Sequence, residues 1–132
     1  MRPYTLDTSV LIAYEQADQP AAGRLLDLLR SGKTLCTCAI TLTEFYTGAP
    51  RGSNPRMDAF INLLTYLDLT QDMAVTAASY RSAARDNGRR HATPDALIAA
   101  LTKHAGGILI TNNVRDFPMQ DIAVEQLGST AA

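Results

Sequence analysis

The chain has 132 residues, of which 46% are hydrophobic and 19% charged, with twelve lysines and arginines against thirteen aspartates and glutamates. This length fits one domain covering residues 1–132, and the apolar content excludes a disordered chain. No apolar run reaches the ~18–20 residues of a membrane span, and Asp7 and Glu15 interrupt the first apolar patch, so we expect no signal peptide and a cytoplasmic protein.

Apolar runs alternate with segments of helical period, which is typical of a parallel α/β sheet with crossover helices. In chain order we predict a strand Pro3 to Leu6, helices at about Ser9 to Glu15 and Pro20 to Arg30, a strand Thr34 to Ile40, helices Thr41 to Gly48 and Pro55 to Thr65, a strand Tyr66 to Leu69, a helix capped by Asp72 that stops at Asn87 and Gly88, a helix from Thr93 to the break at Gly106, and strands 107–111 and Ile122 to Glu125. Right-handed crossovers favour a three-layer α/β/α sandwich around five mainly parallel strands. Residues 128–132 are expected to fray.

The two cysteines lie close together in the second predicted strand. Cys36 and Cys38 share one face of that strand, where extended backbone disfavours a disulfide, so we predict two buried, unbridged thiols. A zinc site would need His91 and His104 as well, and their spacing matches no recognised zinc motif.

Four acidic residues stand near the ends of predicted strands. Asp7 ends the first strand, Glu44 follows the second, and Asp116 lies just beyond the fourth. Because the carboxyl ends of parallel strands line a common crevice, we expect these three side chains at one edge of the sheet. Asp95 opens the helix before the fourth strand and reaches this edge only if the N-terminus of that helix lies there.

Each carboxylate also has a purely structural interpretation. Thr41 and Glu44 match a capping box, and Asp95 suits the first turn of a helix. Asp7 suits the cap of the first helix, and Asp116 suits a turn. However, four anions at one edge repel one another unless a cation neutralises them, which favours a cation site there.

Carboxylates without nitrogen or sulfur ligands suit Mg²⁺ or Mn²⁺. Such an ion activates water and neutralises charge on a scissile phosphate, so the pattern points to phosphoryl chemistry. Neighbouring polar side chains are candidates to orient the carboxylates or the water: Thr8, Ser9, Thr111 and Asn113. The alternative role for Ser9 is helix capping.

Three blocks carry these residues in order: YTLDTSVLIA, ITLTEFYTGAPR and HATPDALIAALTKHAGGILITNNVRDFP. With them the chain resembles the PIN-domain ribonucleases, in particular the VapC-type toxins of bacterial and archaeal toxin–antitoxin pairs. The resemblance spans nearly the whole chain and implies a PIN-like nuclease domain with strand order 3-2-1-4-5.

The resemblance also implies residue roles. It places Asp95 at the shared edge and makes Asp7 and Asp95 the principal metal ligands. Glu44 and Asp116 then complete the pocket, partly through water. Members of the family differ over whether the last acid stands at the position of Asn113 or of Asp116, and we assign Asp116 because Asn113 is uncharged.

As a function, the resemblance implies an Mg²⁺- or Mn²⁺-dependent endoribonuclease that cleaves tRNA or rRNA with metal-activated water. It further implies a homodimer and a cognate antitoxin that blocks the acidic site. Apolar residues of the helix Pro55 to Thr65, with Phe45 and Tyr46, suggest an exposed patch for a partner, with core packing as the alternative.

An acidic pocket repels RNA unless basic groups flank it. Residues 81–91 contain four arginines and one aspartate and lead directly toward Asp95. From this run and its surroundings we predict Arg89, Arg90 and Arg115 as contacts to phosphates of single-stranded or looped RNA. The alternative is a solvated helix face, and a structural rather than catalytic His91.

Other functions compete with a toxin. A PIN nuclease that processes RNA would share the chemistry, and a non-catalytic metal- or RNA-binding module would share the fold. A phosphoacceptor module is disfavoured, because Leu6 precedes Asp7 where an acidic pair is needed and no lysine follows position 103.

Overall fold

Five short parallel strands form one sheet in the order β3-β2-β1-β4-β5 in the computed structural model, which describes residues 1–128. The strands are β1 Tyr4–Leu6, β2 Leu35–Thr37, β3 Thr65–Tyr66, β4 Ile108–Thr111 and β5 Ala123–Gln126. Leu6 pairs with Ile110, so the carboxyl ends of β1 and β4 lie side by side at the centre of the sheet. The predicted α/β class and strand order are confirmed.

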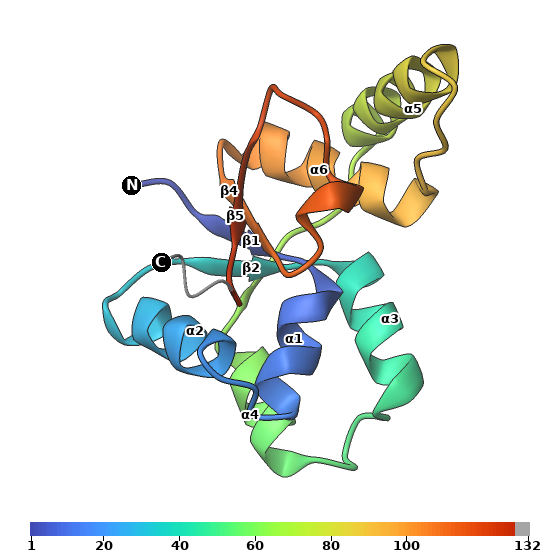
Figure 1. The fold of residues 1–132 in the computed structure, drawn as a ribbon. Helices are drawn as coiled ribbons and strands as arrows, with labels where there is room; N and C mark the ends of the chain where they lie inside the picture. Colours follow the sequence, from blue (N-terminus) through green and yellow to red (C-terminus); the bar gives the residue numbers. More distant parts are fainter. Residues whose placement is uncertain (129–132) are drawn as a thin grey trace.

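Helices cover both faces of this sheet. They are α1 Thr8–Glu15, α2 Ala21–Arg30, α3 Ala39–Gly48, α4 Pro55–Asn62, α5 Gln71–Asp86 and α6 Thr93–Ala105, followed by a 3₁₀ turn, η1, Val114–Asp116. Figure 1 shows α1 to α4 on one side of the strands and α5 with α6 on the other. This arrangement is the expected three-layer sandwich.

The central strands are buried because both layers pack on them. On one face, Leu6 and Ile110 join a cluster with side chains of α1 to α4, including Leu11, Leu25 and Phe45. On the other face, Leu109 packs with Ile98, Leu101 and Phe117. Burying an apolar side chain of this size contributes ~1.5–3 kcal/mol to the stability of the folded state. The strands that end at the candidate site are therefore held by a well-packed core.

Polar contacts hold α5 against α6. Tyr80 of α5 donates a hydrogen bond of 2.9 Å from its hydroxyl to Asp121 Oδ1, and Lys103 of α6 forms a 2.7 Å salt bridge to Asp121 Oδ2. The Thr76 hydroxyl and His104 Nε2 are also hydrogen-bonded, at 2.8 Å. The two helices on either side of segment 87–92 are therefore fixed relative to each other.

The second strand is shorter than predicted. Cys38 is already the N-cap of α3 and Ala39 begins the helix, so Thr41 lies inside its first turn. The buried Thr41 hydroxyl donates a 3.2 Å hydrogen bond to the carbonyl of Leu6. The capping-box interpretation is therefore wrong, because the apolar run from Thr34 to Ile40 hid the point where the strand gives way to the helix.

Other boundaries differ from the prediction as well. Helix α4 ends at Asn62 and β3 occupies Thr65–Tyr66, so the third strand begins earlier than expected. The N-cap of α5 is Thr70, whose hydroxyl accepts a 3.2 Å hydrogen bond from the Met73 amide, and Asp72 lies in the first turn. By contrast, α6 ends as predicted at Gly106, which adopts a left-handed φ of 65°.

The predicted apolar partner patch is mostly core. Phe45, Phe60 and Ile61 are buried, and only Leu63 of this group is strongly exposed, at 64%. The apolar width of α4 arises because this helix packs against α1, where Phe60 stacks on Tyr14 with 4.1 Å between ring centroids. Core packing, the stated alternative, accounts for these residues.

Cys36 and Cys38 are free and buried, as predicted. Among the described residues, no helix is both long and apolar enough to cross a membrane. The tail that was expected to fray lies outside the described residues, apart from Gly128.

Candidate active site

Asp7 stands where β1 ends and α1 begins, with 6% of its surface exposed. Its Oδ2 accepts hydrogen bonds from Ser9 Oγ and from Thr111 Oγ1, each at 2.8 Å. Asp7 is the N-cap residue of α1, but its side chain accepts no capping hydrogen bond from the helix, so the capping interpretation holds for its position only. Within residues 1–128 no hydrogen bond reaches Oδ1, which leaves that oxygen available to a ligand.

Glu44 projects from the middle of α3 and is exposed. Its Oε1 accepts a 2.6 Å hydrogen bond from Thr8 Oγ1, at the start of α1. Because Thr8 follows Asp7 in the chain, this bond holds the Glu44 carboxylate beside the end of β1. Thr8 and Ser9 thus orient two different acids, in agreement with their predicted positions.

Asp95 is half-buried in the first turn of α6. Burial is the largest cause that raises the pKa of Asp95 to about 6, and the negative charges of Asp7, Asp116 and Glu44 raise it as well. The N-terminus of α6 therefore lies at the edge where β1 ends, and the structure brings the four predicted acids into one electrostatic neighbourhood.

Asp116 ends η1 and is exposed. Together with Asp95 it lines a hollow of about 220 Å³, called here the acid pocket. Arg89, Arg90 and Arg115 line the same pocket, so the predicted RNA contacts stand beside two of the predicted acids. Such positive groups offset the repulsion that the carboxylates exert on an incoming phosphate.

The donor set of the four acids fits a hard divalent cation. In residues 1–128, no three His, Cys, Asp or Glu side chains are close enough to form a ready-made metal site. The one salt bridge in that part of the chain joins Lys103 to Asp121, so none of the four carboxylates forms a salt bridge there. Oxygen ligands without a salt bridge and the raised pKa of Asp95 together suit a hard divalent cation such as Mg²⁺ or Mn²⁺ with bound water.

Two asparagines follow β4, and they act differently. Asn113 donates only its backbone amide, to Thr111 Oγ1 at 2.9 Å, and is exposed. Asn112 was not identified from the sequence, yet its side-chain Oδ1 accepts a 2.7 Å hydrogen bond from the backbone amide of Gly128. The backbone amide of Asn112 donates to Ser9 Oγ at 3.0 Å. The only sequence signal for Asn112 is its place directly after a strand.

His91 packs between the acid pocket and α5. Its Nε2 is buried and has no hydrogen-bond partner among the described residues, and its carbonyl accepts a 3.0 Å hydrogen bond from Arg81 Nε. Burial is the main cause that lowers the pKa of His91; Arg81 lowers it too, while Asp116 opposes the shift. These contacts favour the structural role over a general acid or base.

Comparisons with known proteins agree on one family. A profile of the PIN domain matches residues 4–123. Ribonuclease VapC2 of Haemophilus influenzae is 30% identical over 89% of this chain and 91% of its own, and the tRNA(fMet)-specific endonuclease VapC of Shigella flexneri is 29% identical with the same coverage. The structure of DNA-bound VapBC from Salmonella typhimurium has a TM-score of 0.75 and 26% identity, covering 95% of this chain and 98% of that one.

Proposed function

This chain belongs to the PIN domain family, and from that premise we propose that it is a metal-dependent endoribonuclease, the toxin of a toxin–antitoxin pair. The observation that carries the proposal is the gathering of three carboxylates around Asp95 beside the arginines of the acid pocket. Relatives named as VapC ribonucleases support the same activity.

In this proposal Asp7 and Asp95 are the principal ligands of an Mg²⁺ or Mn²⁺ ion, completed by Glu44 and Asp116. When bound, the ion supplies charge neutralisation and an acidified water for attack on phosphorus. The chain's own residues do the rest. Ser9 and Thr111 hold the Asp7 carboxylate, while three arginines bind phosphates of the RNA.

The substrate we propose is single-stranded or looped RNA, because a phosphodiester must reach the recessed Asp7 and Asp95. A relative from Shigella flexneri is named as specific for tRNA(fMet), which makes tRNA the first substrate to test, followed by rRNA. Because tRNA and rRNA are cytoplasmic molecules, we propose that the enzyme acts in the cytoplasm. We also propose that the chain forms one nuclease domain.

A cognate antitoxin is the proposed partner. The structure from Salmonella typhimurium is a VapBC assembly bound to DNA, and this chain is similar to it over nearly its full length. The homodimer implied by the family stays a prediction, which the molar mass of the purified chain by light scattering would test.

The test is cleavage of purified tRNA and rRNA with Mg²⁺, with Mn²⁺ and with EDTA. The wild type should yield discrete fragments only with metal, and Asp7→Asn and Asp95→Asn should yield none while keeping a native circular dichroism spectrum. Asp18→Asn is the matched control, because Asp18 is exposed and lies after α1, outside the four-acid cluster.

If the protein binds RNA but does not cleave it at any metal concentration, the proposed nuclease activity is wrong and the protein is an RNA-binding module. Expression in growing cells then separates a toxin from a processing nuclease. A toxin arrests growth, and co-expression of its antitoxin restores it.

A further inference from the structure

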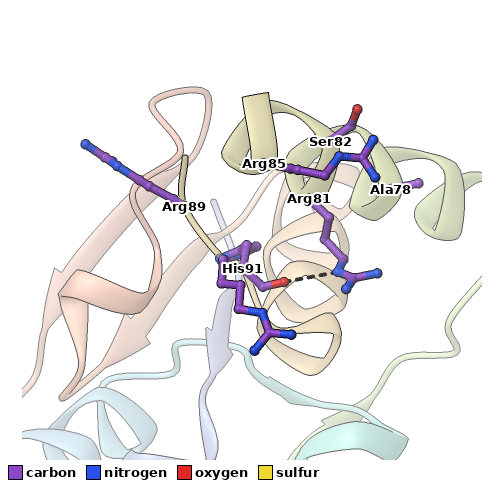
Figure 2. A pocket seen from close by; sticks show the side chains of 7 residues that line it. Ala78, Arg81, Ser82, Arg85, Arg89 and His91 are labelled. Carbon is purple, nitrogen blue, oxygen red and sulfur yellow. Dashed lines mark hydrogen bonds between the residues drawn. The ribbon is translucent and has the colours of Figure 1, made fainter. Parts of the chain in front are cut away.

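A second hollow adjoins the acid pocket and contains no acid. It has a volume of about 330 Å³ and is called here the arginine hollow, because Arg81 and Arg85 of α5 and Arg89 and Arg90 of the following segment line it, together with Ser82 and His91. Figure 2 shows Arg81 and Arg85 extending from α5, with Arg81 reaching the carbonyl of His91.

The positive charge of this hollow is not neutralised within the protein. None of its four arginines forms a salt bridge in the described part of the chain. Arg81 Nε donates to the His91 carbonyl at 3.0 Å, but the side chains of Arg85, Arg89 and Arg90 donate no hydrogen bond inside residues 1–128. Their guanidinium groups are therefore free to donate to a ligand, and a planar guanidinium matches the oxygens of a phosphate.

The arginine hollow and the acid pocket share one wall. Arg89, Arg90 and His91 line both, and Asp95 follows four residues after His91. The shared wall is held in place, because Arg81 donates a hydrogen bond to the His91 carbonyl and Asp121 links Tyr80 of α5 to Lys103 of α6. An anionic chain that places one phosphate among the acids passes the arginines immediately next to it.

Given the proposed ribonuclease activity, we infer that the arginine hollow binds a backbone phosphate of the RNA on one side of the phosphodiester that is cleaved. RNA fits better than an acidic peptide, because its phosphates repeat at every nucleotide and one strand spans both hollows. The substrate must then extend as unpaired RNA beyond the cut on that side. The contact supplies affinity and register without reading a base.

The first test measures binding of a single-stranded RNA oligonucleotide in EDTA, where cleavage is off. Arg85→Gln should weaken binding about fivefold at 0.1 M monovalent salt and make the salt slope shallower by about 0.7, the value for one lost contact to a single strand. Arg85→Lys should restore part of both. Arg30→Gln is the control, since Arg30 is an exposed arginine in the last turn of α2.

Arg85 is the better probe because Arg81 also supports the loop. Loss of the Arg81 bond to His91 would move the wall that carries Arg89 and Arg90, so an Arg81 variant alone mixes position with charge. In cleavage assays with Mn²⁺, Arg85→Gln should raise KM and leave kcat within about twofold, the signature of lost uniform binding.

The second test locates the phosphate. Oligonucleotides carry one neutral methylphosphonate linkage, moved stepwise along the strand on either side of the cut. At one position the neutral linkage should weaken RNA binding by the wild type about fivefold. The same linkage should have little further effect on RNA binding by Arg85→Gln, because both changes remove the same contact.

The outcomes separate this inference from the function on which it rests. If the wild type cleaves RNA but Arg85→Gln has the same affinity and salt slope, the inference is wrong and the nuclease stands. If Arg85→Gln weakens binding of an uncleaved RNA and no metal gives cleavage, the phosphate site stands and the nuclease does not. If Arg85→Gln impairs only binding of the antitoxin, the hollow takes an acidic peptide and the inference is wrong.

Discussion

Asp95 is the carboxylate whose protonation the surrounding structure changes most. Burial and three neighbouring carboxylates raise its pKa to about 6, so the metal-free protein holds a charge at neutral pH that its environment disfavours. A raised pKa in the folded state means that stability falls as pH rises from about 4 to about 6. The residue that the proposed chemistry needs is thus a local cost to folding.

Asp95→Asn should therefore stabilise the metal-free protein at neutral pH. We expect the free energy of unfolding to rise by roughly 1–2 kcal/mol at pH 7.5, allowing for the partial exposure of Asp95, and by much less at pH 4.5. Urea unfolding in EDTA at both pH values measures the difference. An equal gain at the two pH values, or an equal gain from Asp18→Asn, would contradict this electrostatic explanation.

Thr8 tests how much the position of Glu44 matters. Thr8→Val removes the 2.6 Å hydrogen bond that holds Glu44, and we expect cleavage to slow by about tenfold with little change in stability. Thr8→Ser keeps the hydroxyl and should cleave normally. As a control, Thr43→Val changes an exposed threonine of α3, the helix that carries Glu44. Normal cleavage by Thr8→Val would show that Glu44 does not depend on this bond.

Asp7, Glu44 and Asp116 could be selected from the sequence because they follow predicted strands, whereas Asp95 was placed beside them by the family resemblance. The pairing of these acids with their hydroxyl neighbours could not be predicted. Which hydroxyl holds which carboxylate depends on β1 and β4 lying side by side, and Ser9 and Thr111 are 102 positions apart. Asn112 escaped notice for the same reason, because its partner Gly128 lies beyond β5.

At the scale of elements, α3 shows how tertiary contact overrides a local motif. Thr41 and Glu44 have the spacing of a capping box, but the helix begins at Ala39 and both side chains face other parts of the fold. Thr41 bonds to Leu6 and Glu44 to Thr8, so both support the end of β1 and the start of α1. No local propensity in the run 34–41 marks that boundary.

Thr41→Val should reveal this role. Valine has nearly the same shape but leaves the Leu6 carbonyl without its donor, and we expect a loss of about 1–2 kcal/mol in the free energy of unfolding. Denaturant titration measures the loss, and Thr43→Val should change stability by less than about 0.5 kcal/mol. If Thr41→Val changed stability no more than Thr43→Val did, the hydrogen bond from Thr41 to Leu6 would not support the fold.

At the scale of the whole molecule, the alternation of apolar strands and amphipathic helices was enough to predict an α/β sandwich. The strand order came from the family resemblance, because hydrophobic pattern alone does not say which strand lies beside β1. The contact between α5 and α6 through Tyr80, Asp121 and Lys103 left no sequence pattern, since its partners come from three separate segments.

Metal binding should stabilise the whole fold, because the four acids belong to different elements that a shared ion would tie together. At a free Mg²⁺ or Mn²⁺ concentration ten times the dissociation constant, linkage gives about 1.4 kcal/mol, or a rise of a few degrees in Tm. EDTA should reverse the rise, and Asp7→Asn should abolish it. An identical rise in Asp7→Asn would place the ion elsewhere.

The strand order has one more consequence, for the timing of synthesis. β4 lies next to β1 in the sheet, although about a hundred residues separate them in the chain. When the first 100 residues have been synthesised, Asp7, Glu44 and Asp95 are part of the chain, but Thr111, which donates a hydrogen bond to Asp7, and Asp116 are not. The proposed site is therefore incomplete in a nascent chain until synthesis is almost finished, because β4 and η1 are among the last elements to be synthesised.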